Sequence, residues 1–153
     1  MPIFSAQDVI QFAIRIEENG ERFYRNAERV AKDEHAKQLF KRLADEEIAH
    51  RALFQKMIEV TSLESETEDY EGEYMAHLRG HIDGRAVFET DAIAGDDTRS
   101  VLEAAMQREL NAMLYYDELK KFVPEKDHKV LDDIVDEERR HFAELSSIKR
   151  DMR

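Results

Sequence analysis

The sequence contains no cysteine, and only 5 glycines and 2 prolines stand among its 153 residues. Without cysteine the chain cannot form a disulfide, a thiolate metal site, an iron–sulfur cluster or a rubredoxin-type centre. Because glycine and proline punctuate turns, their scarcity beside plentiful Ala, Leu, Glu, Lys and Arg favours long helices over many short strands. We therefore expect an all-α protein, and the chain length (1–153) fits a single domain with a sizeable core.

Long apolar runs are also missing. No stretch approaches the length of a membrane span, and the N-terminal segment MPIFSAQDVIQFAIRIEENG has no basic region followed by an uncharged apolar one. We expect a cytoplasmic protein that does not enter a membrane. The formal net charge is −12, with acidic and basic residues interleaved in every segment, so nucleic acid and anionic membrane surfaces are not expected partners.

Apolar periodicity and capping residues predict four long helices, over residues 5–30, 33–60, 97–123 and 127–152. Pro124 is expected to stop the third helix. About 35 residues, 61–96, separate the second helix from the third, which is a long connection for a compact domain. If these two helices run in the same direction, the chain forms a four-helix bundle with one long crossover. Within the crossover, residues 74–80 are interpreted as a short helix and 85–89 as an extended segment.

The chain repeats one pattern. Segments 14–24 (IRIEENGERFY) and 106–116 (MQRELNAMLYY) carry a Glu, a small residue and a Tyr at identical spacing, and Asp-Glu-Glu-x-x-His occurs at 45–50 and again at 136–141. Residues 5–60 and 97–152 are therefore interpreted as two helical hairpins of one pattern.

An apolar stripe with steps of three and four residues runs along each predicted helix, as expected for the face that packs in a bundle. Near its middle each stripe is interrupted by residues that can bind a metal. These are Glu17, Glu47 with His50, Glu109, and Glu138 with His141. No Arg or Lys occupies a stripe position, and an unpaired buried ion costs several kcal/mol. Two divalent cations are therefore expected to balance the four carboxylates, with both imidazoles neutral.

This set, one Glu from each of two helices and Glu-x-x-His from each of the other two, is that of ferritin-like di-iron and di-manganese carboxylate proteins. The segments IRIEENGERFY, LADEEIAH, MQRELNAMLYY and VDEERRHFAEL resemble the rubrerythrin-like branch of that superfamily. The resemblance implies an all-α, ferritin-like four-helix bundle that binds two iron ions. It implies that Glu17 and Glu109 are terminal ligands and that Glu47 and Glu138 bridge the two irons. It also implies that His50 and His141 each bind one iron.

The chain departs from rubrerythrins at two points. It has no Cys-rich rubredoxin domain, so the resemblance implies an external electron donor, either a rubredoxin-like protein or another reductase. Ala112 stands where rubrerythrins usually carry an extra carboxylate, which supports the iron movement linked to their peroxidase cycle. The oxygen-rich ligands with one imidazole per ion suit iron or manganese, although affinity order alone favours zinc or copper in a purified sample.

Other polar and sulfur-containing residues have plainer interpretations beside functional ones. Tyr24 and Tyr116 are either core residues with a satisfied hydroxyl, or residues behind the metal ligands that act in electron transfer or radical quenching. His77 and His81, four residues apart in the crossover, form either an exposed pair or a surface metal site. Two further histidines near helix starts are expected to face solvent, and three methionines to fill the core: His35 and His128, and Met57, Met106 and Met113.

Three functions follow from these residues. The first is a redox enzyme whose metal centre reduces peroxide or O₂ and is reset by the external donor. The second is an iron-binding or ferroxidase protein for iron storage or delivery. The third is a structural bundle without metal. A homodimer is expected from the family resemblance, with exchange of helices between subunits left open.

Overall fold

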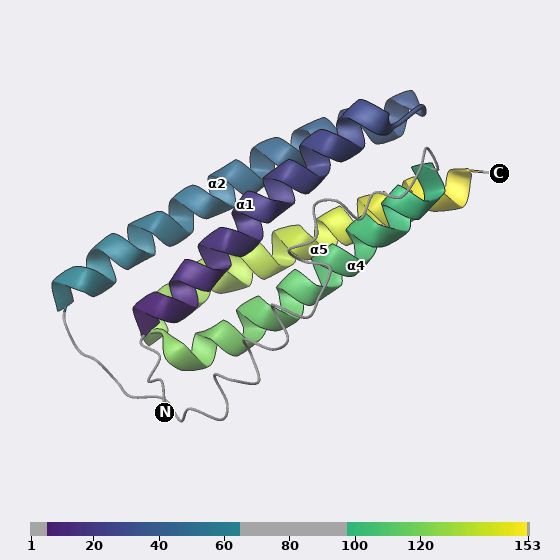
Figure 1. The fold of residues 1–153 in the computed structure, drawn as a ribbon. Helices are drawn as coiled ribbons and strands as arrows, with labels where there is room; N and C mark the ends of the chain where they lie inside the picture. The colour runs from purple at the N-terminus through teal and green to yellow at the C-terminus, as the bar shows by residue number, and fades with distance from the viewer. Residues whose placement is uncertain (1–5, 65–97, 153) are drawn as a thin grey trace, which may run out of the picture.

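In the computed structural model, the described residues are 6–64 and 98–152, and they form a bundle of four long helices (Figure 1). In chain order the elements are α1 (Ala6–Val30), α2 (Glu34–Glu64), α4 (Thr98–Leu119), the short 3-10 helices η1 (Lys120–Phe122) and η2 (Glu125–Asp127), and α5 (His128–Asp151). The expectation of an all-α four-helix bundle is confirmed. None of the described helices combines the length and the apolar character that a membrane span requires.

The bundle consists of two antiparallel hairpins, α1 with α2 and α4 with α5, and most contacts between helices lie within the hairpins. Figure 1 shows α2 and α4 running in the same direction, so α2 ends and α4 begins at opposite ends of the bundle. This is the topology predicted for one long crossover. The interpretations of residues 74–80 and 85–89, and of His77 and His81, fall outside the described residues.

The third predicted helix, 97–123, ends earlier than expected. α4 stops at Leu119, and the chain tightens into η1 before Val123 becomes extended, with φ −119° and ψ 154°. Val123 precedes Pro124, whose ring excludes the helical conformation from the residue before it. The influence of the proline therefore reaches back past its own position. At the start of α2, the Asp33 carboxylate accepts a hydrogen bond from the Ala36 amide at 2.9 Å and caps the helix.

Two apolar clusters fill the ends of the bundle and leave a polar layer between them. One cluster centres on Ile10, Phe54 and Tyr116, and the other on Tyr24, Phe40 and Leu43. Both draw residues from all four helices. The apolar stripe of each helix thus contributes to both clusters, and the residues that interrupt the stripes lie in the layer between them. The fold therefore places these polar side chains at mid-height in an otherwise apolar interior.

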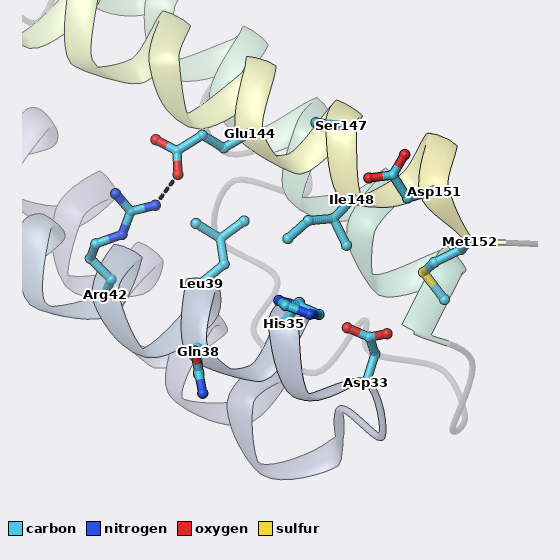
Figure 2. Close-up of a pocket in the computed structure, with 10 residues that line it drawn as sticks. All are labelled: Asp33, His35, Gln38, Leu39, Arg42, Glu144, Ser147, Ile148, Asp151 and Met152. Atoms are coloured by element: carbon cyan, nitrogen blue, oxygen red, sulfur yellow. Dashed lines mark hydrogen bonds and ion pairs between the residues drawn. The ribbon is translucent and has the colours of Figure 1, made fainter.

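A groove of about 1000 Å³ lies between the start of α2 and the end of α5. Figure 2 shows its apolar floor, Leu39 and Ile148, and the ion pair that joins Arg42 to Glu144 across the two helices. Among the lining residues of α5, Glu144 is the nearest in sequence to His141. The Arg42–Glu144 ion pair therefore joins the two hairpins, and it lies at the end of the groove that is closest in sequence to the polar layer.

Candidate metal centre

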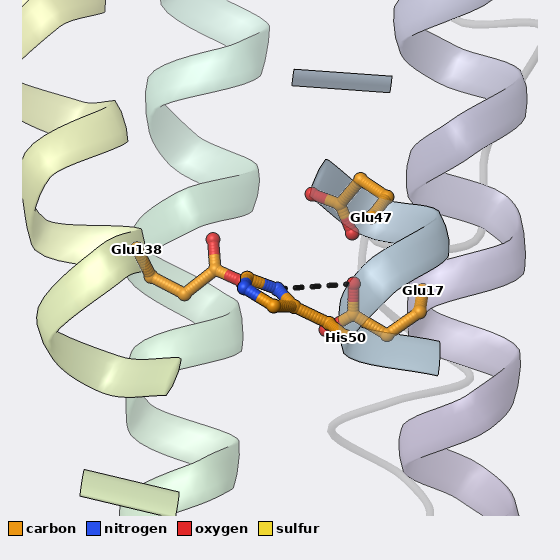
Figure 3. Close-up of side chains that lie close together, drawn as sticks. All are labelled: Glu17, Glu47, His50 and Glu138. Atoms are coloured by element: carbon orange, nitrogen blue, oxygen red, sulfur yellow. Dashed lines mark ion pairs between the residues drawn. The ribbon is translucent and has the colours of Figure 1, made fainter. Parts of the chain in front are cut away.

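The structure brings all six residues that interrupt the apolar stripes into one cluster. Each is at most 3% exposed, and every helix contributes at least one of them. The residues are Glu17 on α1, Glu47 and His50 on α2, Glu109 on α4, and Glu138 and His141 on α5. Figure 3 shows four of these side chains converging from opposite sides of the bundle. The hairpin repeat in the sequence therefore corresponds to two matching halves of one cluster.

The cluster divides into two overlapping groups, and within each group the ligand atoms all lie within 4.8 Å of one another. Glu47 and Glu138 belong to both groups. Glu17 and His50 complete one, and Glu109 and His141 complete the other. This division is the one that two bridging carboxylates, two terminal carboxylates and one imidazole per ion would produce.

Glu138 lies at the centre of both groups. One carboxylate oxygen, Oε1, is 3.1 Å from His50 Nδ1, and the other, Oε2, is 3.3 Å from His141 Nδ1. The carboxylates that belong to only one group are slightly more distant, with Glu17 Oε2 at 3.6 Å from His50 Nδ1 and Glu109 Oε2 at 3.7 Å from His141 Nδ1. The two halves have matching dimensions, as the repeated sequence pattern requires.

The cluster fits a pair of divalent cations, because several of its buried atoms have no hydrogen-bond partner. They are Glu17 Oε2, His50 Nδ1, Glu109 Oε2, both carboxylate oxygens of Glu138, and His141 Nδ1. Buried polar atoms without partners are rare in folded proteins, since each carries a desolvation cost. All six of these atoms belong to the two groups, so a metal ion in each group would satisfy them together.

Two residues of the centre, Glu46 and Glu137, were missed by the sequence interpretation. The outer nitrogen of each imidazole contacts a carboxylate on the opposite helix: His50 Nε2 contacts Glu137 of α5, and His141 Nε2 contacts Glu46 of α2. A carboxylate in this position fixes the tautomer and orientation of a metal-binding imidazole. The repeat itself carried the signal, because Asp-Glu-Glu-x-x-His duplicates two glutamates and only the second of each pair was assigned a role.

Replacing Glu46 or Glu137 with glutamine should weaken metal binding by roughly 10–100-fold, since loss of the charged acceptor reduces the basicity and orientation of the imidazole. Glu46→Gln is expected to act on the His141 group and Glu137→Gln on the His50 group. A Co²⁺ titration followed by visible absorption measures both affinities. Asp45→Asn is the matched control, because Asp45 is exposed and pairs with Arg25. Equal affinities in all four proteins would contradict this role.

Tyr24 and Tyr116 each reach across the bundle to the terminal carboxylate of the other hairpin. The Tyr24 hydroxyl donates to Glu109 Oε1, and the Tyr116 hydroxyl donates to Glu17 Oε1. Each phenol therefore binds the oxygen opposite to the one that faces the centre. Burial, and then the nearby carboxylates, raise the pKa of both phenols well above the ordinary value, so each keeps its proton.

Without metal, the imidazoles take up protons to balance the carboxylates. Burial lowers the pKa of His50, but Glu138 and Glu17 raise it more strongly, to about 12. For His141, burial again lowers the pKa, and Glu109 and Glu138 raise it to about 10. The metal-free centre therefore holds imidazolium groups at neutral pH, although a metal ion requires the neutral form.

The pKa values of the carboxylates shift in opposite directions, although burial raises all of them. Burial, followed by repulsion from Glu138, raises the pKa of Glu109 to about 8. Burial and Glu17 raise the pKa of Glu47 well above its ordinary value. Burial alone would also raise the pKa of Glu138, but its contacts with Glu109 and both imidazoles lower it below the ordinary range. Of these three carboxylates, Glu138 keeps its charge in the metal-free centre, whereas the raised pKa values of Glu47 and Glu109 favour their protonated forms.

The stripe pattern, which has no Arg or Lys on it, did not reveal Arg108, a buried basic residue off the stripe. Arg108 is 4% exposed and lies beside the centre, because it precedes Glu109 in α4 and turns toward α1. Gly20 leaves the space that it uses. A Cβ at position 20 would stand 2.6 Å from Glu47 Oε2 and 2.7 Å from Arg108 Nη2. Gly20 therefore makes room for Glu47 and Arg108 together.

Within residues 6–64 and 98–152, the other histidines and methionines play no part in the cluster. His35 is exposed, as expected. His128 is half-buried instead, with Nε2 3.2 Å from the Val123 carbonyl oxygen, because the extended residue before Pro124 turns that carbonyl toward α5. The methionines expected to fill the core pack in or against the apolar clusters: Met57, Met106 and Met113.

Comparison with known proteins agrees with this geometry. A solved structure from Thermotoga maritima, provisionally assigned as a ferritin-like diiron-carboxylate protein, is 28% identical to this chain. The match has a TM-score of 0.72 and covers 98% of this chain and 97% of that one. No curated protein sequence shows significant similarity. The family model for rubrerythrin matches residues 8–149, which include all six residues of the cluster. The chain therefore belongs to the rubrerythrin family.

Proposed function

We propose that the protein is a non-haem di-iron oxidoreductase that reduces peroxide or O₂ with electrons from an external donor. The observation that carries this proposal is the pair of overlapping ligand groups, whose buried inward atoms have no hydrogen-bond partner within the protein. Burying four carboxylates together is costly unless cations lie among them, and two divalent metal ions would balance their charge. Carboxylates exposed on the surface would be solvated by water and would not require a bound cation.

The ligand set supports a reactive centre. Each group offers one imidazole, one terminal carboxylate and a share of two carboxylates common to both groups. That set suits iron or manganese, and it would leave room for a further ligand on each ion. When bound, iron would supply electrons and a Lewis-acidic position at which peroxide or O₂ is reduced.

The chain's own residues support that chemistry in three ways. The apolar clusters on both sides exclude bulk water from the centre. Glu46 and Glu137 hold the imidazole rings by their outer nitrogens. Tyr24 and Tyr116 hold the terminal carboxylates and keep a phenolic proton near the centre. Reduction of one hydrogen peroxide to two waters takes two electrons and two protons. Because the sequence has no cysteine, we assign the electron supply to a separate rubredoxin-like protein or other reductase.

Rapid mixing tests the proposal. The protein, loaded anaerobically with ferrous iron, is mixed with hydrogen peroxide, and ferric absorbance is followed in the near ultraviolet. We expect oxidation far faster than that of free ferrous iron, and repeated turnover when a reductant is present. The matched control is Asp136→Ala, an exposed position two residues from Glu138, which should react as the wild type does. Slow oxidation, or a single turnover with every reductant tried, would contradict the proposal.

Iron storage or delivery is the alternative, because the bundle is ferritin-like in topology. The size of the protein in solution separates the two. A large shell would favour storage, whereas a homodimer, which we propose for this chain, favours the redox reaction. We further propose that the protein acts in the cytoplasm.

A further inference from the structure

Arg108 is a buried cation in a part of the bundle that is otherwise crowded with carboxylates. Its Nη2 donates to the Ile16 carbonyl oxygen at 3.3 Å, and its guanidinium carbon lies 5.4 Å from the centre of the Phe23 ring. An Arg above an aromatic face is stabilised by the ring quadrupole. These contacts with α1 hold the guanidinium in one place, and at 4% exposure water screens it little.

The held position is next to a carboxylate of the centre. Arg108 Nη2 and Glu47 Oε2 both lie within 2.7 Å of the point where a side chain at Gly20 would begin. Glu47 belongs to both ligand groups. The charge of Arg108 therefore acts on a carboxylate that both metal positions would share.

This charge has no counterpart in the other half of the centre. When the hairpins are matched by their glutamates, the residue before Glu17 is Ile16, and the residue before Glu109 is Arg108. Gly20 in the first hairpin likewise corresponds to Ala112 in the second. The repeat therefore differs at the two positions that admit the guanidinium. Ile16 retains one link to Arg108, because its carbonyl oxygen accepts the hydrogen bond.

We propose that Arg108 is a positioning residue that raises the reduction potential of the metal centre through Glu47. The inference rests on the proposed redox function. Oxidation of a bound metal adds positive charge to the cluster, and a fixed cation nearby makes that addition less favourable. In a buried site the effect is screened weakly. The protein with Arg108 therefore favours the ferrous form more than a protein with an apolar residue at this position.

A redox titration of the iron-loaded full-length chain tests the inference, with ferric absorbance read against a series of mediators. Arg108→Met keeps most of the side-chain volume and removes the charge. We expect the ratio of ferric to ferrous iron at a fixed potential to rise at least tenfold, which is a shift of 59 mV for a one-electron couple. Arg108→Lys should recover most of that shift, because it restores the charge, and a purely structural role would not follow this order.

Two further variants make the result decisive. Arg139→Met removes a charge from a side chain that is 68% exposed and adjacent in sequence to Glu138, so solvent screening should leave the potential close to that of the wild type. Arg108→Gln also removes the charge but keeps an amide that can donate a hydrogen bond to the Ile16 carbonyl oxygen, and should also lower the potential. It serves as the test if Arg108→Met does not fold.

Each outcome separates this inference from the proposed function. An unchanged potential in Arg108→Met or, where that variant does not fold, in Arg108→Gln would overturn the role of Arg108, and would leave peroxide reduction by the wild type intact. A shift equal to that of Arg139→Met would also overturn it. Failure of the wild-type chain to bind iron would overturn both proposals. A potential that falls in Arg108→Met, returns in Arg108→Lys and stays constant in Arg139→Met supports the assignment.

Discussion

Replacing Glu138 with alanine is expected to abolish binding of both metal ions. Glu138 belongs to both ligand groups, and each of its carboxylate oxygens faces a different imidazole. Loss of this side chain therefore removes a ligand from both metal positions and reduces the number of carboxylates in the cluster from four to three. After iron-supplemented expression, the wild type should contain about two metal ions per chain, the number that the four-Glu, two-His ligand set predicts. The Glu138→Ala protein should contain about none.

The same substitution should abolish stabilisation by metal. A ligand that binds only the folded state at 100 times its dissociation constant adds about 2.7 kcal/mol to the unfolding free energy. The wild type should show a gain of at least this size when excess Fe²⁺ or Mn²⁺ is added, whereas Glu138→Ala should show none. Asp136→Ala, on the exposed side of α5, should retain the full gain. Wild-type metal content in Glu138→Ala would mean that this carboxylate is not a ligand.

Loading the metal-free protein should release on the order of four protons for two ions, because a metal binds the deprotonated forms of its ligands. The groups that would lose them are His50, His141, Glu109 and Glu47, whose pKa values all lie above their ordinary values in the absence of metal. Metal affinity should therefore rise steeply with pH across the neutral range. Titration of Mn²⁺ into weakly buffered protein with a pH indicator counts the protons directly.

The stability of the metal-free protein should have the opposite pH dependence. A group whose pKa is higher in the folded state binds more protons folded than unfolded, so the unfolding free energy falls as pH rises. For Glu109 the window runs from 4.5 to about 8, and for the imidazoles from 6.5 to about 10 in His141 and about 12 in His50. Each such proton contributes about 1.4 kcal/mol per pH unit, so a loss of several kcal/mol is expected between pH 6 and 8.

Denaturant unfolding at pH 6, 7 and 8, with chelator or with metal, measures this loss. The loaded protein should lack the decline, since ligands bound to metal no longer exchange protons in this range. The lowered pKa of Glu138 acts in the other direction only below 4.5, outside the range measured. A metal-free protein that becomes more stable from pH 6 to 8 would show that the imidazoles are not protonated in the folded state.

Much of this architecture could be predicted from periodicity and repetition. The steps of three and four along each helix were sufficient to place Glu17, Glu47 and Glu109 inside the bundle. They were sufficient because residues spaced by three and four lie on the same face of a helix, and an apolar face packs into the core. The length of residues 61–96 was compatible with a crossover, on the condition that the two helices that it joins run in the same direction. Helix ends were less predictable, because Pro124 excludes the helical conformation from Val123 and α4 gives way to a 3-10 turn before it.

The contacts behind the ligands could not be predicted in the same way. Which oxygen Tyr24 binds, and which imidazole Glu137 faces, depend on how two helices pack across the bundle, and a one-helix pattern does not contain that information. Arg108 shows the limit most clearly. Its position lies off the apolar stripe, where a charged residue normally faces solvent, but its long side chain turns inward into the space beside Gly20. Only the absent side chain of one glycine permits this.

The division of the cluster between two matching hairpins has a consequence for how such a centre can arise. Either hairpin holds one terminal carboxylate, one shared carboxylate and one imidazole, which is half of everything required. A symmetric pair formed by two copies of one such hairpin would assemble the same six groups, but only at concentrations where the copies meet. Joining both halves in one polypeptide makes the centre independent of dilution. It also frees each half to mutate separately, as the exchange of isoleucine for arginine before the terminal glutamate illustrates.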